Sequence, residues 1–301
     1  MQITPHLWFD TQAVEAAEFY ASTFPDSSVG DVATLRDTPS GDTDVVSFRL
    51  CGQPFMAISA GPLFRFTPAI SFLVRCGSAE EVDELWARLA EGGTALMALE
   101  AYPFSERYGW LEDRYGLSWQ LMAVGGGEVG QRIVPTLMFT GDVSGRAEEA
   151  MRFYASVFPD SEVGEIARYG AGQPHDAEGT VMHGSFRLAG QDFAAMDSAY
   201  PHGFGFNEAV SLMVGCDSQE EIDRYWERLS GVPEAEQCGW LKDRYGVSWQ
   251  VVPSKLDELV ARGTEEQRAR VTASLLQMKK LDLAELEQAY EAEEAPLGGR
   301  G

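Results

Sequence analysis

Apolar side chains alternate along residues 3–9 and then recur at helical spacing through residues 13–24, where Pro25 ends the pattern. Alternation is typical of a strand with one buried face, and apolar residues three or four positions apart are typical of a helix. Three short runs rich in β-branched and aromatic residues follow, separated by Gly, Pro and Asp, at 29–36, 45–50 and 55–59. The pattern predicts a strand, a helix and three more strands, which together form a βαβββ module.

The same order starts again at a second apolar run, residues 69–76. Ser78 stands three residues before Glu81, the arrangement of a capping box, and the acidic segment 80–91 ends at two glycines. Strand candidates then occupy residues 95–99, 109–112 and 117–122. The first half of the chain therefore predicts two consecutive βαβββ modules.

Two long motifs occur twice in the chain. Residues 19–30 read FYASTFPDSSVG and residues 153–164 read FYASVFPDSEVG, with 10 identities in 12 positions. Residues 109–120 (GWLEDRYGLSWQ) and 239–250 (GWLKDRYGVSWQ) also share 10 of 12. Because the matches keep their order over about 120 residues, they indicate a duplicated domain rather than a short solenoid repeat.

The repeat also sets the expected domain boundaries. The first domain is expected at residues 1–124 and the second at residues 133–253. A Gly-rich linker, residues 125–132, lies between them, and residues 254–301 form a tail. The chain is thus expected to hold two domains, a short linker and a C-terminal extension.

The tail carries an apolar stripe at helical spacing, made of Val271, Leu275, Met278 and Leu281. Asp282 is placed to cap a following helix over 283–292. Such helices are expected to pack on the second domain or on another subunit, which leaves a homodimer open.

The charge balance excludes one class of partner. Acidic residues outnumber basic ones by 47 to 23, which gives a formal net charge of −24 and argues against nucleic acid as a partner. No apolar run reaches the ~18–20 residues that span a membrane, and no secretory signal stands at the start. The 4 cysteines show no CxxC spacing, which favours reduced thiols in a cytoplasmic protein.

Several motifs together point to a family. The opening ITPHLWFD, the segments AISFLV and EEVDELW, the two repeated motifs and the tail sequence RVTASLLQMKKLDLAELEQAY resemble the PhnB-like branch of the vicinal oxygen chelate superfamily. That superfamily includes glyoxalase I, bleomycin-resistance proteins and extradiol dioxygenases, and this branch is often labelled 3-demethylubiquinone methyltransferase-like. The resemblance covers residues 3–252. It implies an α+β fold of two tandem glyoxalase-like domains, each with two βαβββ modules whose sheets curve around a cleft.

Metal-using relatives carry His or Glu at four strand positions that face this cleft. The resemblance places these positions, in the two copies, at Thr4 and Val134, Ala57 and Ala195, Ser71 and Ser211, and Gln120 and Gln250. None of these residues is a carboxylate or an imidazole, and only the two glutamines could ligate, weakly. We therefore expect no bound metal and no cofactor.

Alternation along the strands predicts which side chains line each cleft. In the first copy they are His6, Trp8, Ser71, Ser118, Gln120 and Met122, and in the second they are Thr136, Met138, Ser211, Ser248, Gln250 and Val252. Trp110 and Trp240 follow a glycine at the rim, as core residues or as a stacking wall, whereas Trp119 and Trp249 are expected in the core. A mostly apolar cleft with a few polar groups suits a small organic ligand.

His6 is the one histidine expected on an inward-facing core strand, which makes it a weak candidate for a general base. Thr136 stands at its position in the second copy, so a pocket-wall role is the alternative. No other catalytic residue is identified. The Asp-Arg pairs at 113–114 and 243–244 are expected to be turn residues in an ion pair, or else to supply an Arg clamp for an anionic ligand.

The sequence thus predicts a metal-free protein that binds or sequesters a small molecule, with a cleft in each domain. One alternative is an enzyme of the glyoxalase and dioxygenase superfamily with an unassigned reaction. Another is a protein-interaction role for the acidic surface and the tail. Methyltransferase activity is not expected, because the chain lacks the glycine-rich turn between a parallel strand and a helix that usually binds a sulfonium nucleoside.

Overall fold

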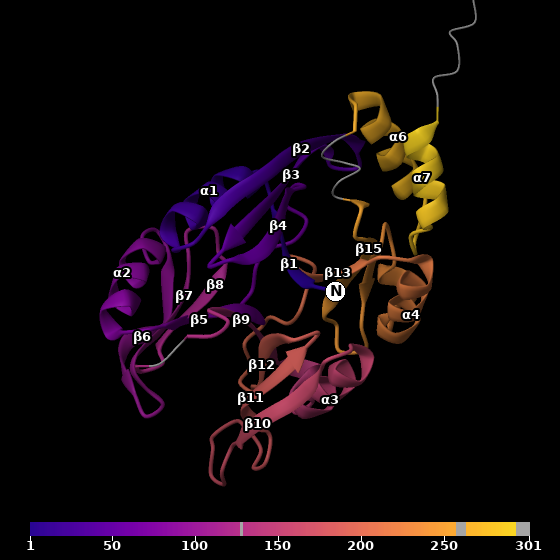
Figure 1. The fold of residues 1–301 in the computed structure, drawn as a ribbon. Helices are drawn as coiled ribbons and strands as arrows, with labels where there is room; N and C mark the ends of the chain where they lie inside the picture. Colours follow the sequence, from indigo (N-terminus) through magenta and orange to yellow (C-terminus); the bar gives the residue numbers. More distant parts are fainter. Residues whose placement is uncertain (127–128, 257–262, 293–301) are drawn as a thin grey trace, which may run out of the picture.

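The computed structural model describes residues 1–126, 129–256 and 263–292, and its strands form two sheets with helices packed on them (Figure 1). The first module contains β1 (Ile3–Phe9), α1 (Ala13–Thr23), β2 (Ser28–Thr38), β3 (Gly41–Leu50) and β4 (Gln53–Ser59). The second contains β5 (Ile70–Cys76), α2 (Ala79–Leu89), β6 (Thr94–Tyr102), β7 (Ser105–Glu112) and β8 (Ser118–Ala123). As predicted, the Ser78 hydroxyl caps α2 by accepting a hydrogen bond from the Glu81 amide at 3.3 Å.

The second copy repeats this order with one exception. Its first module contains β9 (Ile133–Phe139), the 3-10 turn η1 (Gly141–Val143), α3 (Ala147–Val157), β10 (Glu162–Arg168), β11 (Val181–Leu188) and β12 (Gln191–Asp197). Its second module contains β13 (Val210–Cys216), α4 (Gln219–Leu229), the 3-10 turn η2 (Pro233–Ala235), β14 (Trp240–Lys242) and β15 (Ser248–Pro253). Between α4 and β14 the chain thus forms η2, where copy one forms β6. The α+β fold of duplicated modules is confirmed, with this one shortened member.

The two copies exchange modules between the sheets. Sheet A has the strand order β14-β15-β13-β1-β4-β3-β2, and sheet B has the order β10-β11-β12-β9-β5-β8-β7-β6. The junctions are antiparallel: β1 pairs with β13, where His6 lies opposite Ser211, and β5 pairs with β9, where Ser71 lies opposite Thr136. Each sheet therefore joins the first module of one copy to the second module of the other. The expectation that each copy builds a cleft from its own two modules is corrected accordingly.

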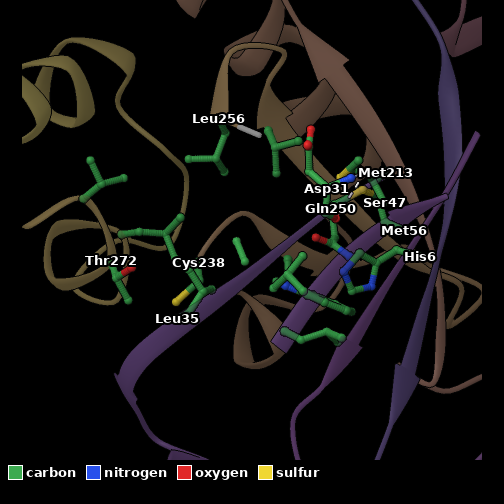
Figure 2. A pocket seen from close by; sticks show the side chains of 17 residues that line it. His6, Asp31, Leu35, Ser47, Met56, Met213, Cys238, Gln250, Leu256 and Thr272 are labelled. Carbon is green, nitrogen blue, oxygen red and sulfur yellow. Dashed lines mark hydrogen bonds between the residues drawn. The ribbon is translucent and has the colours of Figure 1, made fainter. Parts of the chain in front are cut away.

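The C-terminal tail takes the place that strand β6 has in copy one. It contains α6 (Glu265–Leu275) and α7 (Leu283–Glu291), and the Asp282 carboxylate caps α7 as predicted. Between the helices, the carbonyls of Met278 and Lys279 accept hydrogen bonds from the amides of Cys238 and Gly239, both at 2.8 Å. In copy one, β6 pairs with the corresponding edge of β7. The tail thus packs on the second copy, and α6 also contacts β2 of the first copy, where Arg36 and Glu265 form an ion pair at 2.7 Å. Thr272 on α6 and Leu35 on β2 line the same cavity (Figure 2).

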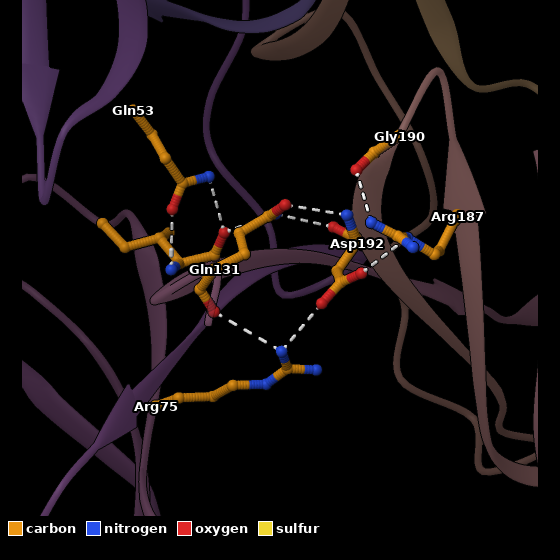
Figure 3. A network of polar contacts seen from close by, with 7 residues as sticks. Gln53, Arg75, Gln131, Arg187, Gly190 and Asp192 are labelled. Atoms are coloured by element: carbon orange, nitrogen blue, oxygen red, sulfur yellow. Dashed lines mark hydrogen bonds and ion pairs between the residues drawn. The ribbon is translucent and has the colours of Figure 1, made fainter. Parts of the chain in front are cut away.

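Two glutamines at matching positions join the sheets. The Gln53 side chain, at the start of β4 in sheet A, exchanges two hydrogen bonds with the backbone of Ile133 in sheet B, at 2.8 and 2.9 Å. Gln191 in sheet B does the same for Ile3 in sheet A, at 2.7 and 3.0 Å. Figure 3 shows the first of these contacts beside an ion pair between Arg75 and Asp192 at 2.9 Å. The exchange of modules is thus fixed by paired polar contacts as well as by the strands.

Two buried carboxylates tie the helices to the sheets. Asp113 accepts hydrogen bonds from the Tyr20 hydroxyl on α1 at 2.7 Å and from the Trp119 indole at 2.9 Å. Asp243 accepts the matching bonds from Tyr154 and Trp249 at the same distances. Burial raises the pKa of both carboxyl groups, although these hydrogen bonds lower it. The two tryptophans are fully buried, as predicted.

The expected ion pairs at the two Asp-Arg turns are not formed. Arg114 instead stacks on the Phe19 ring, at 4.5 Å from the centroid, and lies 3.4 Å from Glu91. Arg244 stacks on Phe153 at 4.4 Å. Each aspartate turns inward because it has two buried donors to satisfy, and each arginine remains outside over an aromatic ring.

The four cysteines are free thiols. Burial raises the pKa of Cys76 and of Cys216 to about 12, so both thiols stay protonated at neutral pH. Within the described ranges, the helices are too short or too polar to cross a membrane.

Candidate functional site

A cavity of about 190 Å³ lies between sheet A and the tail (Figure 2). It lies on the face of the sheet opposite the core that packs on the helices, because Val46 and Ala57 face that core and their neighbours Val45 and Met56 line the cavity. Strands of both copies supply one wall: His6, Ala33, Leu35, Val45, Met56, Ile58, Met213, Trp240, Gln250 and Val252. The tail supplies the other: Leu256, Val271, Thr272 and Leu275. The edge of the cavity is completed by Asp31, Ser47 and Cys238. A mainly apolar lining with few polar groups is typical of a small-molecule site.

His6 lines this cavity from the centre of sheet A, between Ser211 on β13 and Met56 on β4. Its side chain is buried, and its Nδ1 atom has no hydrogen-bond partner among the residues that the structure describes. Burial lowers the pKa of the imidazole to about 4, so the ring is neutral at neutral pH. The ring meets Trp240 edge-on, with centroids 5.5 Å apart. His6 can therefore offer a ligand one neutral donor or acceptor, but it carries no charge.

Gln250 supplies a second polar group to the cavity. Its Nε2 atom donates to the Ser211 hydroxyl at 2.9 Å, and no described residue donates a hydrogen bond to its Oε1 atom. The hydroxyl of Ser248, on the same strand, has no hydrogen-bond partner among the described residues, but it does not line the cavity. The Oε1 atom of Gln250 is therefore the acceptor that the cavity offers to a ligand or water.

The corresponding face of sheet B is filled by the protein itself. Leu73, Tyr108, Val134 and Ala194 form a buried cluster there, with Met97, Tyr102, Trp110 and Met122 packed against it. The Tyr108 hydroxyl donates to Gln120 Oε1 at 2.7 Å, and Gln120 Nε2 donates to the Ser71 hydroxyl at 2.8 Å. The Trp110 indole donates to Ser118 at 2.7 Å. The polar groups that stay unpaired on sheet A are therefore paired on sheet B.

The residues predicted to line clefts divide between the two sheets. His6, Trp240 and Gln250 line the sheet A cavity, and the Ser211 hydroxyl accepts a hydrogen bond from the Gln250 side chain. Trp8 lies beside Trp240, but its indole donates to the Gly61 carbonyl at 2.8 Å and it does not line this cavity. Val252 also lines this cavity, whereas Ser248 lies on sheet A without lining it. The other predicted residues lie on sheet B and are buried or half-buried: Ser71, Trp110, Ser118, Gln120, Met122, Thr136 and Met138.

The strand position assigned to Ala57 and Ala195 needs correction. Both side chains belong to the core on the helix side of the sheets, and the adjacent residues Met56 and Ile58 line the cavity. Every residue from Pro54 to Ile58 is apolar, so alternation along this strand gives no signal for the inward face.

The donor atoms around the cavity do not fit a catalytic metal. A catalytic zinc, for example, takes about three protein ligands drawn from Cys, His, Asp and Glu. The sheet A cavity offers the His6 imidazole, the Gln250 amide and the Cys238 thiol, with the Asp31 carboxylate exposed at its edge. Nowhere in the described ranges do three residues of the ligating types converge. No step through a metal ion is therefore derived for this site.

Comparisons with known proteins place this geometry in context. Residues 1–122 and residues 131–252 each match the family model of 3-demethylubiquinone-9 3-methyltransferase. No curated protein gives a significant match. The PhnB protein from Bacillus cereus is 40% identical over 41% of this chain and 100% of that chain, with a TM-score of 0.39. Glyoxalase I from Zea mays is 10% identical over 85% of this chain and 95% of that chain, with a TM-score of 0.50, a likeness that shows the fold alone.

Proposed function

The chain belongs to the 3-demethylubiquinone-9 3-methyltransferase family, with two copies of the family's domain in tandem, and we propose that it is a metal-free binding protein for a small, neutral, largely apolar molecule. The ligand is held between sheet A and the tail. The observation that carries this proposal is the mainly apolar cavity in which Gln250 Oε1 and His6 Nδ1 lack protein partners within the described ranges.

The size of the cavity supports a ligand with a single ring. An engineered apolar cavity of about 150 Å³ in another protein stays dry and binds benzene. The sheet A cavity, at about 190 Å³, is somewhat larger and similarly lined by Leu, Ile, Val and Met. A substituted benzene ring is of a size that suits this volume.

The charges around the cavity support a neutral ligand. Its described lining contains no Lys or Arg, and burial keeps His6 neutral by lowering its pKa to about 4. Asp31 is the charged residue of the lining, and it is exposed at the edge. An anion would find no compensating positive charge there, and burying an unpaired charge is strongly unfavourable.

The enzymatic alternative has less support. A general base must gain a proton near the working pH, and burial disfavours the charged form of His6. The cause of this pKa shift is burial, and among the described residues no carboxylate is hydrogen-bonded to the imidazole. Sequence reasoning also gives no sulfonium-nucleoside site for the methyltransferase activity in the family's description. We therefore propose binding without chemistry at the sheet A cavity.

Toluene tests the proposed binding site directly. We expect toluene to raise the melting temperature of the wild-type protein, because a ligand that binds only the folded state stabilises it. Ala33→Phe adds a phenyl ring to a half-buried residue of the cavity wall. We expect this variant to fold, since phenylalanine is favoured in strands, and to lose the toluene-induced shift. Thermal denaturation at increasing toluene concentration measures both effects.

Ala167 provides the matched control. It occupies the position of Ala33 in the second copy, on β10, and it is exposed. Ala167→Phe should therefore bind toluene as the wild type does. If toluene stabilises neither the wild type nor the control, or if Ala33→Phe responds like the wild type, the sheet A cavity is not the binding site.

A further inference from the structure

The internal repeat allows the two cleft faces to be compared residue by residue. Tyr108 and Cys238 occupy the same position, directly before the repeated Gly-Trp-Leu sequence. Beyond them, Trp110 pairs with Gln120 on sheet B, and Trp240 pairs with Gln250 on sheet A, in the same register. The two glutamines are therefore equivalent, and the main difference beside them is a tyrosine in one copy and a cysteine in the other.

On sheet B the tyrosine ring fills the cleft and satisfies the glutamine. The ring of Tyr108 packs with Leu73 and Ala194, and its hydroxyl donates to Gln120 Oε1 at 2.7 Å. On sheet A the counterparts of these two apolar residues are Met213 and Met56, and both line the cavity. The cavity is therefore lined by the counterparts of two residues that pack with the Tyr108 ring on sheet B.

Cys238 does not replace the missing contact. Its backbone has a φ of 53°, in the left-handed region, and its amide bonds to the tail carbonyl of Met278 at 2.8 Å. Its short side chain lies at the edge of the cavity, and no described residue donates to Gln250 Oε1. The amide oxygen that accepts a phenol hydrogen bond on sheet B is thus free of a protein donor on sheet A.

We infer that the ligand of the sheet A cavity is a neutral phenol, whose ring takes the space that Tyr108 fills on sheet B and whose hydroxyl donates a hydrogen bond to Gln250 Oε1. This inference rests on the proposed binding function and names the chemical class of the ligand. An ether or a carbonyl in the same place could not form this hydrogen bond, because its oxygen and the Gln250 oxygen are both acceptors. A phenolate would bury a negative charge in a lining with no described cation.

Three probes of similar shape separate this chemistry from simple apolar binding. They are p-cresol, which is the tyrosine side chain ending in a methyl group, toluene, which lacks the hydroxyl, and 4-methylanisole, which carries an acceptor without a donor. Titration calorimetry of the wild-type chain should show p-cresol binding about tenfold more tightly than either of the other two, because one neutral hydrogen bond typically contributes that much.

Matched glutamine variants locate the contact that gives this preference. Gln250→Met keeps a side chain of similar length without the amide, and we expect it to bind all three probes with nearly equal affinity. Gln120→Met removes the equivalent amide on sheet B and should retain the wild-type preference for p-cresol. A preference that survives in Gln250→Met, or that is lost in Gln120→Met, would contradict the assignment.

The possible failures are distinguishable from one another. If the wild type binds toluene and p-cresol equally, the phenol class is wrong while the apolar binding site remains. If the wild type binds none of the three probes, both the proposed binding function and the phenol class are wrong.

Discussion

Asp243→Ala is expected to lower the free energy of unfolding by about 3–5 kcal/mol, because it leaves two buried donors without an acceptor and each such loss costs about 1–3 kcal/mol. The donors are the Tyr154 hydroxyl and the Trp249 indole, and both residues are fully buried. The same carboxylate also accepts from the backbone amides of Tyr245 and Val247 in the turn before β15. Urea denaturation of the wild type and the variant measures this loss.

Two further variants show whether the hydrogen bonds cause the effect. Asp217→Ala removes an exposed carboxylate and should change stability little. Tyr154→Phe should destabilise the wild type but have almost no further effect in the Asp243→Ala background, since the shared bond is already lost. A loss below about 1 kcal/mol in Asp243→Ala, or full additivity of the two changes, would contradict the role given to this carboxylate.

The stability of the protein is expected to fall as the pH is lowered from about 6.5 to about 4, in part through His6. Above pH 6.5 the imidazole is neutral in both the folded and the unfolded chain. Between these pH values the unfolded chain binds a proton at His6, but the folded chain does not, because burial lowers the folded pKa to about 4. The contribution of His6 to the free energy of unfolding is therefore fully present at neutral pH. It decreases by about 3 kcal/mol as the pH falls through this range.

A non-titrating variant isolates this contribution from that of the other groups. The His6→Asn variant should not show the decrease in stability that His6 causes. When the pH is lowered from 7 to 5, the free energy of unfolding of the variant should therefore rise by about 2 kcal/mol relative to that of the wild type. His175→Asn, at an exposed histidine, is the matched control. Urea denaturation at several pH values gives these differences. If the two histidine variants follow the same pH dependence, His6 is not held neutral in the folded chain.

Local sequence signals were sufficient for the modules and their caps. Period-2 spacing, helical spacing and runs of β-branched and aromatic residues identified each strand and helix of copy one, and Ser78 and Asp282 cap the helices that they were predicted to cap. These features depend on neighbours within a few residues, which the sequence displays directly.

The exchange of modules between the sheets could not be predicted in this way. Strand β1 pairs with β13 rather than with β5, and these two strands have nearly the same pattern of apolar residues. The choice between them depends on distant contacts, including the hydrogen bonds of Gln53 and Gln191 across the sheets. A pattern that is nearly the same in both candidates cannot distinguish them.

The candidate site could be predicted only in part for a similar reason. Alternation turned His6 and Gln250 toward clefts, but it assigned them to the clefts of different copies. It could not show that both residues line one cavity on sheet A, or that the tail covers them. The difference between Tyr108 and Cys238 is visible in the repeat, yet it gains meaning only from the contact between Tyr108 and Gln120. The cysteine at the position of Tyr108 therefore points to a binding site only when the structure shows that it removes the hydrogen bond to the glutamine.

A crystal structure of the wild-type protein grown with p-cresol tests the central claim most directly. The expected result is one p-cresol molecule per chain, between sheet A and α6, with its hydroxyl within hydrogen-bond distance of Gln250 Oε1. Tyr108 should still fill the sheet B cleft and contact Gln120, as it does without ligand. An empty sheet A cavity at saturating p-cresol, or a molecule bound in the sheet B cleft instead, would contradict the claim that sheet A carries the binding site.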